Sequence, residues 1–280
     1  ALDAHAYPLT AGTSALIAAQ QSWLADIAKA DAKNLATIPT IGSKEAVALL
    51  PMLLGLDSSS SVAIPALAYP TYAVGAQAVG AKVVLADTAA ELTQAVDLVW
   101  LNSPSNPTGN VLTAAELKAW ITYARDTNTI VASDECYLTL GWDTQPISIL
   151  DMKLTAGDYK NLIALHSLSK RSSLAGYRAA MISGDKKLVA AILLARKHLG
   201  LITPTPSQAA AAAAWLDEAG AQSQKQVYLN RRAVMQQAFV AAGFKISASA
   251  AGLYLWLTRD EDCWSSVNWL AERGVLVAPG

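Results

Sequence analysis

The stretch Ala95–Tyr137 reads AVDLVWLNSPSNPTGNVLTAAELKAWITYARDTNTIVASDECY, and it decides the fold. Its two apolar runs, Ala95–Leu101 and Thr129–Ser133, are short and apolar on both faces, which is typical of strands buried inside a parallel sheet. Between them, Thr113–Asp126 predicts a helix that begins with a capping box, TAAE, in which the Thr and Glu side chains each satisfy an amide at the helix start. Strand, helix and strand in this order predict a right-handed crossover and an α/β architecture.

The same alternation of short apolar runs and amphipathic segments continues on both sides of this stretch and changes near residue 185. Further buried strands are expected at Val83–Ala86, Leu162–Leu168 and Ala179–Ser183. Beyond them we expect helices at Lys186–Leu199, Ser207–Ala219, Ala221–Ala242 and Trp264–Arg273, and strands at Phe244–Ala248, Leu253–Leu257 and Val275–Val277. The change predicts a large domain over residues 1–205 and a smaller α+β domain over residues 206–280, with the boundary inside the helical stretch near 205–225.

Composition excludes several classes of protein. The 280 residues suit one large or two modest domains, and 53% hydrophobic with only 15% charged residues excludes intrinsic disorder. A net charge of −1 provides no basic field for nucleic acid. Two distant cysteines and three histidines without ligand spacing predict neither a disulfide framework nor a metal site.

A mean hydropathy of +0.28 requires that a membrane span be considered. The longest uncharged stretch, Ser58–Ala81, is interrupted by prolines and glycines that would leave backbone groups unpaired in lipid. We interpret it as a loop, a buried strand and a helix start. With no visible signal peptide, a cytoplasmic location is the simplest expectation. Both ends look cut, because the chain opens on Ala1 and stops at Gly280 just after an expected strand.

Two segments place polar side chains directly after expected strands, where parallel sheets bind ligands. Asn102–Gly109 is a rigid Pro/Gly loop that can hold an Asn amide in one orientation, or it is a turn before the capped helix. Ile130–Tyr137 runs from apolar residues into two acids and a tyrosine. A half-buried Asp there is costly unless a cation meets it; the alternative is a solvated acidic loop.

Two other segments suggest covalent and anion chemistry. In His166–Arg178 an apolar strand ends in serines, a lysine and a later arginine. A lysine near positive charge is a better amine nucleophile, and hydroxyls with an arginine suit phosphate; a basic surface loop is the alternative. In Thr40–Val47 a Gly-Ser step opens a helix and exposes amides to an anion, although many helices begin with Ser and no Walker motif is present.

Together these segments resemble the class I/II aminotransferases, which are pyridoxal-phosphate (PLP) enzymes of fold type I. The resemblance rests on Asn106-Pro107-Thr108-Gly109, Asp134-Glu135-Cys136-Tyr137, Ser167-Leu168-Ser169-Lys170 and Gly176-Tyr177-Arg178, and it extends back to Tyr7-Pro8-Leu9-Thr10-Ala11-Gly12. It implies an α/β fold with a large, mostly parallel sheet flanked by helices and a smaller α+β C-terminal domain. Within the family, the chain is most similar to succinyldiaminopimelate aminotransferases of lysine biosynthesis.

The resemblance also implies residue roles. Lys170 would hold PLP covalently and shuttle the substrate proton, and Asp134 would keep the pyridine nitrogen protonated so that the ring accepts electrons. Tyr137 and Asn106 would bond the phenolic oxygen, and Tyr69 would stack on the ring, with Tyr72 as a competitor. The phosphate would be bound by Ser167, Ser169 and Arg178, by the amides of Ser43 and Lys44, and by Tyr7 from the neighbouring subunit of a homodimer.

The family's arginine for the substrate α-carboxylate would lie beyond Gly280, and the N-terminal segment that closes over the site would precede Ala1. A polypeptide with only these residues is therefore expected to be inactive. Arg171, directly after the expected catalytic lysine, has two open interpretations. It is either a helix-start arginine paired with a nearby carboxylate, or an extra cation that favours long, multiply anionic substrates.

The expected activity is transfer of an amino group between an amino acid and a 2-oxo acid, specifically N-succinyl-diaminopimelate and 2-oxoglutarate, with no nucleic acid or membrane partner. The alternatives are an aspartate/alanine-type aminotransferase or a C–S β-lyase of the same fold, and a non-catalytic PLP-binding regulator domain. A nucleotide-binding α/β protein is more distant, since neither a GxGxxG loop nor a Walker loop is present.

Overall fold

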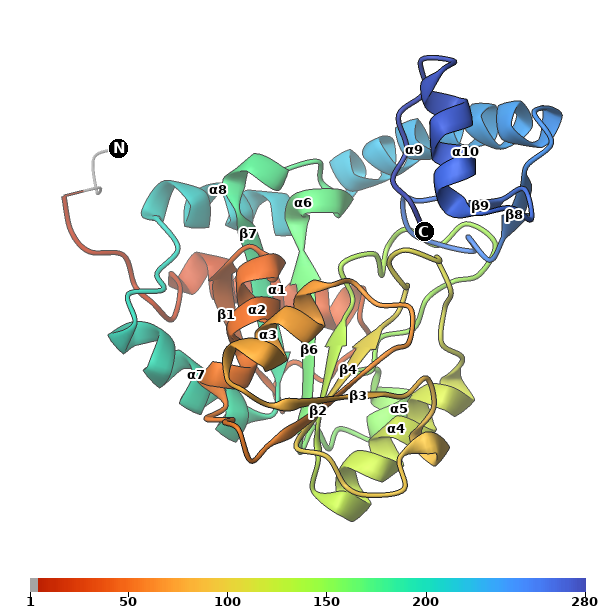
Figure 1. Cartoon of the computed structure of the whole chain (residues 1–280). Helices are drawn as coiled ribbons and strands as arrows, with labels where there is room; N and C mark the ends of the chain where they lie inside the picture. Colours follow the sequence, from red (N-terminus) through yellow and green to blue (C-terminus); the bar gives the residue numbers. More distant parts are fainter. Residues whose placement is uncertain (1–4) are drawn as a thin grey trace.

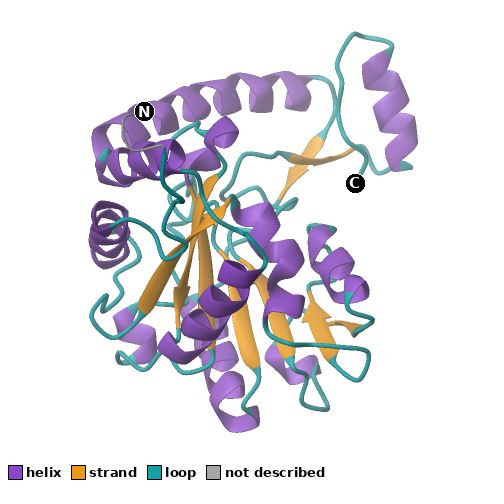
Figure 2. Cartoon of the chain, turned by 90° about the vertical axis from the view of Figure 1, so that its left-hand side faces the viewer, coloured by secondary structure: helices purple, strands orange, loops and turns teal. Residues whose placement is uncertain are grey.

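The computed structural model describes residues 5–280 as a central sheet covered by helices on both faces, with a smaller lobe at the C-terminal end (Figures 1 and 2). The seven strands are β1 Ala36–Ile41, β2 Ser61–Ile64, β3 Lys82–Leu85, β4 Leu98–Asn102, β5 Ile130–Asp134, β6 Leu162–Ser167 and β7 Ala179–Gly184. Their order across the sheet is β1-β7-β6-β5-β4-β2-β3. The neighbours from β3 to β6 pair in parallel, whereas β7 is antiparallel to both β6 and β1. The predicted mostly parallel α/β sheet is confirmed.

Two apolar layers explain why the helices sit where they do. The helices of the large domain are α1 Ser14–Asp26, α2 Ser43–Leu53, α3 Thr71–Ala78, α4 Ala114–Thr127, α5 Met152–Thr155, α6 Leu168–Arg171, α7 Lys186–His198 and α8 Thr205–Leu216, with short 3₁₀ turns η1 Ala89–Glu91 and η2 Ala175–Tyr177. One core layer joins buried side chains of α1, α4 and α8, and the other joins those of α2, α3 and α7. Alternate residues of the central strands enter opposite layers, as the period of two in a strand requires.

The C-terminal lobe has its own small core. It consists of the long helix α9 Glu218–Ala241, the antiparallel pair β8 Lys245–Ser247 and β9 Trp256–Thr258, and α10 Cys263–Ala271. Phe239, Phe244 and Leu270 form its buried centre. Helix α8, in contrast, contributes Trp215 to the core of the large domain. The division of the chain at residues 205 and 206 stays a prediction.

Local sequence explains the differences from the predicted elements. Strand β1 was missed because Thr37, Pro39 and Thr40 interrupt its apolar residues, and as an edge strand it tolerates a proline. The pairing strand β9 begins at Trp256, later than the expected Leu253, and residues 275–277 form no strand. The capping box at Thr113 and Glu116 is present as predicted. None of the helices formed by residues 5–280 has both the length and the apolar composition needed to cross a bilayer.

Candidate functional site

The carboxyl ends of β4, β5 and β6 bring the predicted polar residues to one edge of the sheet. Asn102 and Asp134 are register partners on β4 and β5, and Lys170 lies one turn beyond β6. The Asn102 side-chain amide donates to the carbonyl oxygen of Asp134 at 3.0 Å, and its oxygen accepts from the Asn106 amide at 2.7 Å. The sheet therefore fixes the backbone positions of Asp134 and Asn106 relative to each other.

Asp134 is a buried carboxylate held by two donors. The Tyr72 hydroxyl donates to one oxygen at 3.0 Å, and the Cys136 amide donates to the other at 3.2 Å. Burial raises the pKa of Asp134, while these hydrogen bonds and nearby His166 act in the opposite direction. Because a buried carboxylate without a cation is costly, this position suits a cationic ligand atom.

Cys136 lies close to several of the candidate residues, although sequence analysis assigned it no role. Burial and the neighbouring Asp134 raise the pKa of its thiol well above the usual value, whereas a hydrogen bond with Ser43 and the charge of Lys170 lower it. The Cys136 thiol is thus close to residues of β5, of the start of α2 and of the turn after β6. The sequence signal for this proximity is limited to the position of Cys136 two residues after Asp134.

The start of α2 faces the guanidinium of Arg178. Gly42 precedes the helix with φ 74° and ψ 161°, a conformation that essentially only glycine adopts. A Cβ on Gly42 would lie 2.1 Å from Nη2 of Arg178. No side chain caps the first amides of this helix. Free helix-start amides beside a guanidinium form a cradle for a phosphate group.

The turn after β6 adds the hydroxyl side of this cradle. Ser167 is buried and accepts a hydrogen bond from the Ser169 amide at 3.1 Å, which orders the short helix α6. Lys170 is half-buried in that helix, and its carbonyl oxygen accepts from Tyr228 of α9 at 3.2 Å. Helix α9 therefore touches the lysine turn directly.

The two competing tyrosines are separated by the structure. Tyr72 is fully buried, stacks on Trp100 with ring centroids 5.0 Å apart, and is bonded to Asp134. Tyr69 is half-buried at the start of α3, and its ring lies 5.5 Å from Nζ of exposed Lys44. The hydroxyl of Tyr72 is thus engaged by Asp134, whereas the stacking role of Tyr69 stays a prediction.

Tyr137 is buried next to Tyr254, a residue between β8 and β9 that sequence reasoning did not select. Burial, together with the charge and hydrogen bond of Tyr254, raises the pKa of Tyr137, so its phenol keeps its proton. The contact joins positions far apart in the chain, and no sequence signal marked it.

Two other predicted residues lie elsewhere. Tyr7 is 95% exposed on the N-terminal segment, and its reach to a neighbouring subunit stays a prediction. Arg171 is buried and donates to Glu218 at 2.7 Å and to the carbonyl oxygen of Ala214 at 2.8 Å. The paired-arginine interpretation of Arg171 is therefore confirmed, and the interpretation of an extra substrate-binding cation is wrong.

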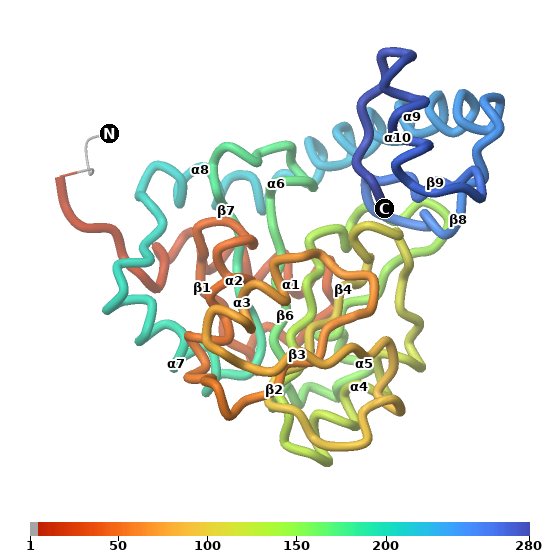
Figure 3. Tube along the Cα trace, viewed as in Figure 1, coloured from red at the N-terminus to blue at the C-terminus, as the bar shows by residue number. Residues whose placement is uncertain are grey.

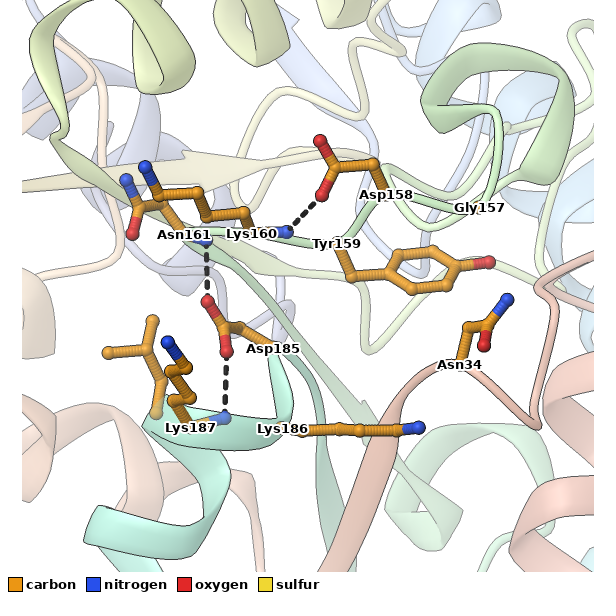
Figure 4. Close-up of a pocket in the computed structure, with 10 residues that line it drawn as sticks. Asn34, Gly157, Asp158, Tyr159, Lys160, Asn161, Asp185, Lys186 and Lys187 are labelled. Carbon is orange, nitrogen blue, oxygen red and sulfur yellow. Dashed lines mark hydrogen bonds between the residues drawn. The ribbon is translucent and has the colours of Figure 1, made fainter.

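A surface cleft of about 650 Å³ lies at the opposite end of β6 and is not this site (Figure 4). Its acidic groups are occupied by local hydrogen bonds: Asp185 accepts from the amides of Asn161 and Lys187, and Asp158 accepts from the Lys160 amide. In the described part of the chain, no group of three or more His, Cys, Asp or Glu residues could hold a metal ion.

The residues at the carboxyl ends of the strands have side chains and amides whose chemistry fits a PLP molecule. The Gly42 cradle, with free amides and Arg178, matches a phosphate, and buried Asp134 matches a protonated ring nitrogen. Lys170 lies on α6, and Asn106 and Tyr137 lie in the loops that follow β4 and β5.

Comparison with known proteins agrees with this fit. The family model of class I and II aminotransferases matches residues 3–280. A probable aminotransferase of Mycobacterium tuberculosis is 48% identical over 99% of this chain and 67% of its own length. The 4-dedimethylamino-4-oxo-anhydrotetracycline transaminase of Streptomyces rimosus is 46% identical over 100% of this chain and 78% of its own length. The LL-diaminopimelate aminotransferase of Dehalococcoides mccartyi is 30% identical over 99% of this chain and 75% of its own length.

Among solved structures, the N-succinyldiaminopimelate aminotransferase of Mycobacterium tuberculosis superposes with a TM-score of 0.85. It covers 97% of this chain and 75% of its own chain, at 23% identity. This likeness bears on the fold.

Proposed function

The chain belongs to the class I and II aminotransferases, a PLP-dependent transaminase family, and from that premise we propose that the residues at the carboxyl edge of its sheet form the transamination site. The observation that carries the proposal is the strand register, which brings Asp134 at the end of β5, the lysine turn after β6, and Gly42 and Arg178 beside the β1–β7 pair to one end of the sheet. A buried acid and an anion cradle at this end are what the two ends of the cofactor require.

Bound at this site, PLP supplies an aldehyde that links to amines and a ring that accepts the electrons of the substrate's α-carbon bond. The amine of Lys170 binds the cofactor and carries the proton to and from the substrate α-carbon. The carboxylate of Asp134 keeps the proton on the ring nitrogen. Tyr137, which retains its own proton, and Asn106 donate to the phenolic oxygen.

The remaining candidates hold and orient the cofactor. The amides of Ser43 and Lys44, the hydroxyls of Ser167 and Ser169, and the Arg178 guanidinium bind the phosphate. Tyr69 stacks on the ring face, since Tyr72 is already bonded to Asp134. Exposed Tyr7 reaches the phosphate of a second copy, which makes the working form a homodimer.

For the substrates we propose N-succinyl-diaminopimelate as amino donor and 2-oxoglutarate as acceptor. The support is the resemblance to succinyldiaminopimelate aminotransferases and the relatives whose names carry diaminopimelate. Arg171 no longer supports it, because its guanidinium is paired with Glu218. A second candidate, amination of a bulky cyclic ketone, is favoured by the 46% identical relative from Streptomyces rimosus, whose name carries a 4-oxo-anhydrotetracycline.

The test uses the full-length protein. Addition of PLP is expected to produce a visible absorption band that shifts with glutamate, and borohydride reduction with peptide mapping is expected to label Lys170. Labelling of Lys44 or Lys197 instead would overturn the site.

Comparison of kcat/KM across N-succinyl-diaminopimelate, alanine, tyrosine and a cyclic 4-oxo acceptor then ranks the substrates. A lower value for the succinylated donor would overturn the substrate assignment only. Sedimentation of a fully active monomer would remove Tyr7 from the site.

A further inference from the structure

Arg196 is a fully buried cation in the last turn of α7, and it has no place among the candidate site residues. In the tube view the teal trace of α7 lies beside the red and orange traces of β1 and α2 (Figure 3). Nη1 of Arg196 donates to Oε1 of Glu45 at 2.6 Å, and Nη2 donates to the carbonyl oxygen of Leu201 at 3.1 Å. The carboxylate of Glu45 therefore compensates a charge that has no access to water.

Glu45 connects this arginine to the backbone step that precedes α2. Its second carboxylate oxygen accepts a hydrogen bond from the Ile41 amide at 3.1 Å. The Gly42 amide in turn donates to the carbonyl oxygen of Thr40 at 2.9 Å. Both amides at this step are thus bonded, which supports the unusual conformation of Gly42, with φ 74° and ψ 161°.

Glu45 is at the same time an anion in the first turn of the helix that is proposed to hold a phosphate. Its two oxygens bond Arg196 and Ile41, and no side chain caps the first amides of this helix. An unpaired carboxylate in this turn would repel a phosphate bound by those amides. Pairing with Arg196 neutralises the carboxylate and still leaves one of its oxygens for the Ile41 amide.

We propose that Arg196 is a positioning residue of the phosphate site, which neutralises Glu45 so that this carboxylate holds the Ile41–Gly42 step without repelling the cofactor phosphate. Arg196 acts through Glu45 and does not touch the cofactor. This inference rests on the proposed function, because it requires that the amides at the start of α2 bind a phosphate. An ion pair that only stabilised the fold would leave the preference for a phosphorylated ligand unchanged.

The test measures the affinity of the full-length protein for PLP and for pyridoxal, which lacks the phosphate. Arg196→Met keeps an unbranched side chain but leaves Glu45 unpaired, and it is expected to lower the preference for PLP over pyridoxal by about 10-fold. Adding Glu45→Gln to Arg196→Met is expected to restore the wild-type preference. The glutamine oxygen still accepts from the Ile41 amide but carries no charge.

Equal losses in the single and the double variant would show that the charge of Glu45 is not responsible, and would overturn the proposal. An unchanged preference in Arg196→Met would overturn it as well. Arg125→Met is the matched control, because Arg125 of α4 pairs with Asp158 at 3.6 Å and donates to the carbonyl oxygen of Thr155 at 3.0 Å. It should keep the wild-type preference, and a loss equal to that of Arg196→Met would also count against the proposal.

Removal of one partner of a buried ion pair is strongly destabilising. If Arg196→Met does not fold, Glu45→Gln alone decides the question. It leaves the charge of Arg196 without its anion, so the preference for PLP should equal or exceed that of the wild type, and a lower preference would overturn the proposal. Equal affinity of the wild-type protein for PLP and pyridoxal would instead overturn the proposed phosphate site, and this inference with it.

Discussion

The phosphate side and the phenolic side of the site are built in different ways. The phosphate side, around Gly42 and Arg178, is built on strands and helices of the large domain and is braced by an ion pair between α7 and α2, although its lysine turn also contacts α9. Arg196 of α7, fully buried, donates to Glu45 of α2 at 2.6 Å, and Glu45 also accepts from the Ile41 amide at 3.1 Å. The phenolic side, around Asn106 and Tyr137, consists of loops whose backbone partners lie in residues 249–252 of the C-terminal lobe.

We expect the phosphate side to determine how tightly the cofactor is held, and the phenolic side to adjust the reacting end of the cofactor. A half braced mainly by the core beneath Gly42 depends less on the position of the C-terminal lobe, which suits an anchor for the cofactor phosphate. A half bonded to the lobe changes when the lobe moves, which suits groups that tune the reacting end. Substitutions on the phosphate side should therefore lower affinity for the phosphate, and substitutions on the phenolic side should leave that affinity unchanged.

The largest expected effect comes from the lysine between the two halves. Lys170→Ala should retain PLP through the phosphate cradle but lose transamination by several orders of magnitude, because general-base action alone contributes about 10²–10⁴-fold. Lys160→Ala, in the cleft at the opposite end of β6, is the control and should leave turnover unchanged. Steady-state rates and cofactor content measure both. Equal losses in the two variants would move the site to the other edge of the sheet.

On the phosphate side, Gly42→Ala should weaken PLP binding by about 10- to 100-fold, since a Cβ there collides with Arg178 and a charge-assisted hydrogen bond is worth about 1.5–3 kcal/mol. Gly55→Ala is the matched control, with φ 77° and nothing within 4 Å of the added Cβ. Both variants should lose free energy of unfolding from left-handed strain. Only Gly42→Ala should lose the preference for PLP over pyridoxal, which lacks the phosphate. Loss of that preference in both variants would show that strain, rather than the cradle, is responsible.

On the phenolic side, Gly109→Ala should separate the loop after β4 from residues 249–251 of the C-terminal lobe and leave phosphate binding unchanged. Its Cβ would meet the carbonyl oxygen of Ala251, and relieving that contact breaks the bonds from Ser249 and Ala251. Strain of about 1–3 kcal/mol predicts roughly 5- to 150-fold faster amide exchange at Ser249 and Ala251. The preference for PLP over pyridoxal should stay as in the wild type. A fall in that preference would show that the two halves are coupled and would remove the distinction between them.

The sequence predicted the two halves unequally, for physical reasons. Buried strands such as β5 and β6 are visible as apolar runs, so the residues directly after them, Asp134 and Lys170, could be located without a structure. The Gly-Ser step before α2 was visible too, but its contact with Arg178 depends on the missed edge strand β1. Tyr254 could not be found, because its contact arises only when the lobe folds back on the loop after β5.

The smallest expected effect concerns Asp134, which lies between the halves. Its pKa is raised by burial, so the folded protein without cofactor holds the proton to a higher pH than the unfolded chain does. The stability linked to this proton is complete below the ordinary Asp pKa and is lost as the pH rises from there toward the raised pKa. Asp134→Asn, which can still accept from Cys136 and donate to Tyr72, does not lose it.

Between pH 5 and 8, the apo form of Asp134→Asn should therefore match or exceed the wild type in Tm, with the difference shrinking as the pH falls. Asp57→Asn is the control of opposite sign, since hydrogen bonds from Ser59 lower the pKa of exposed Asp57 and stability is lost there as the pH falls. Saturating PLP should reverse the order for Asp134, because the wild-type carboxylate then gains a cationic partner. Thermal unfolding with and without PLP measures this, and an apo difference that grows toward low pH would mean that Asp134 is stabilised as the carboxylate before any cofactor arrives.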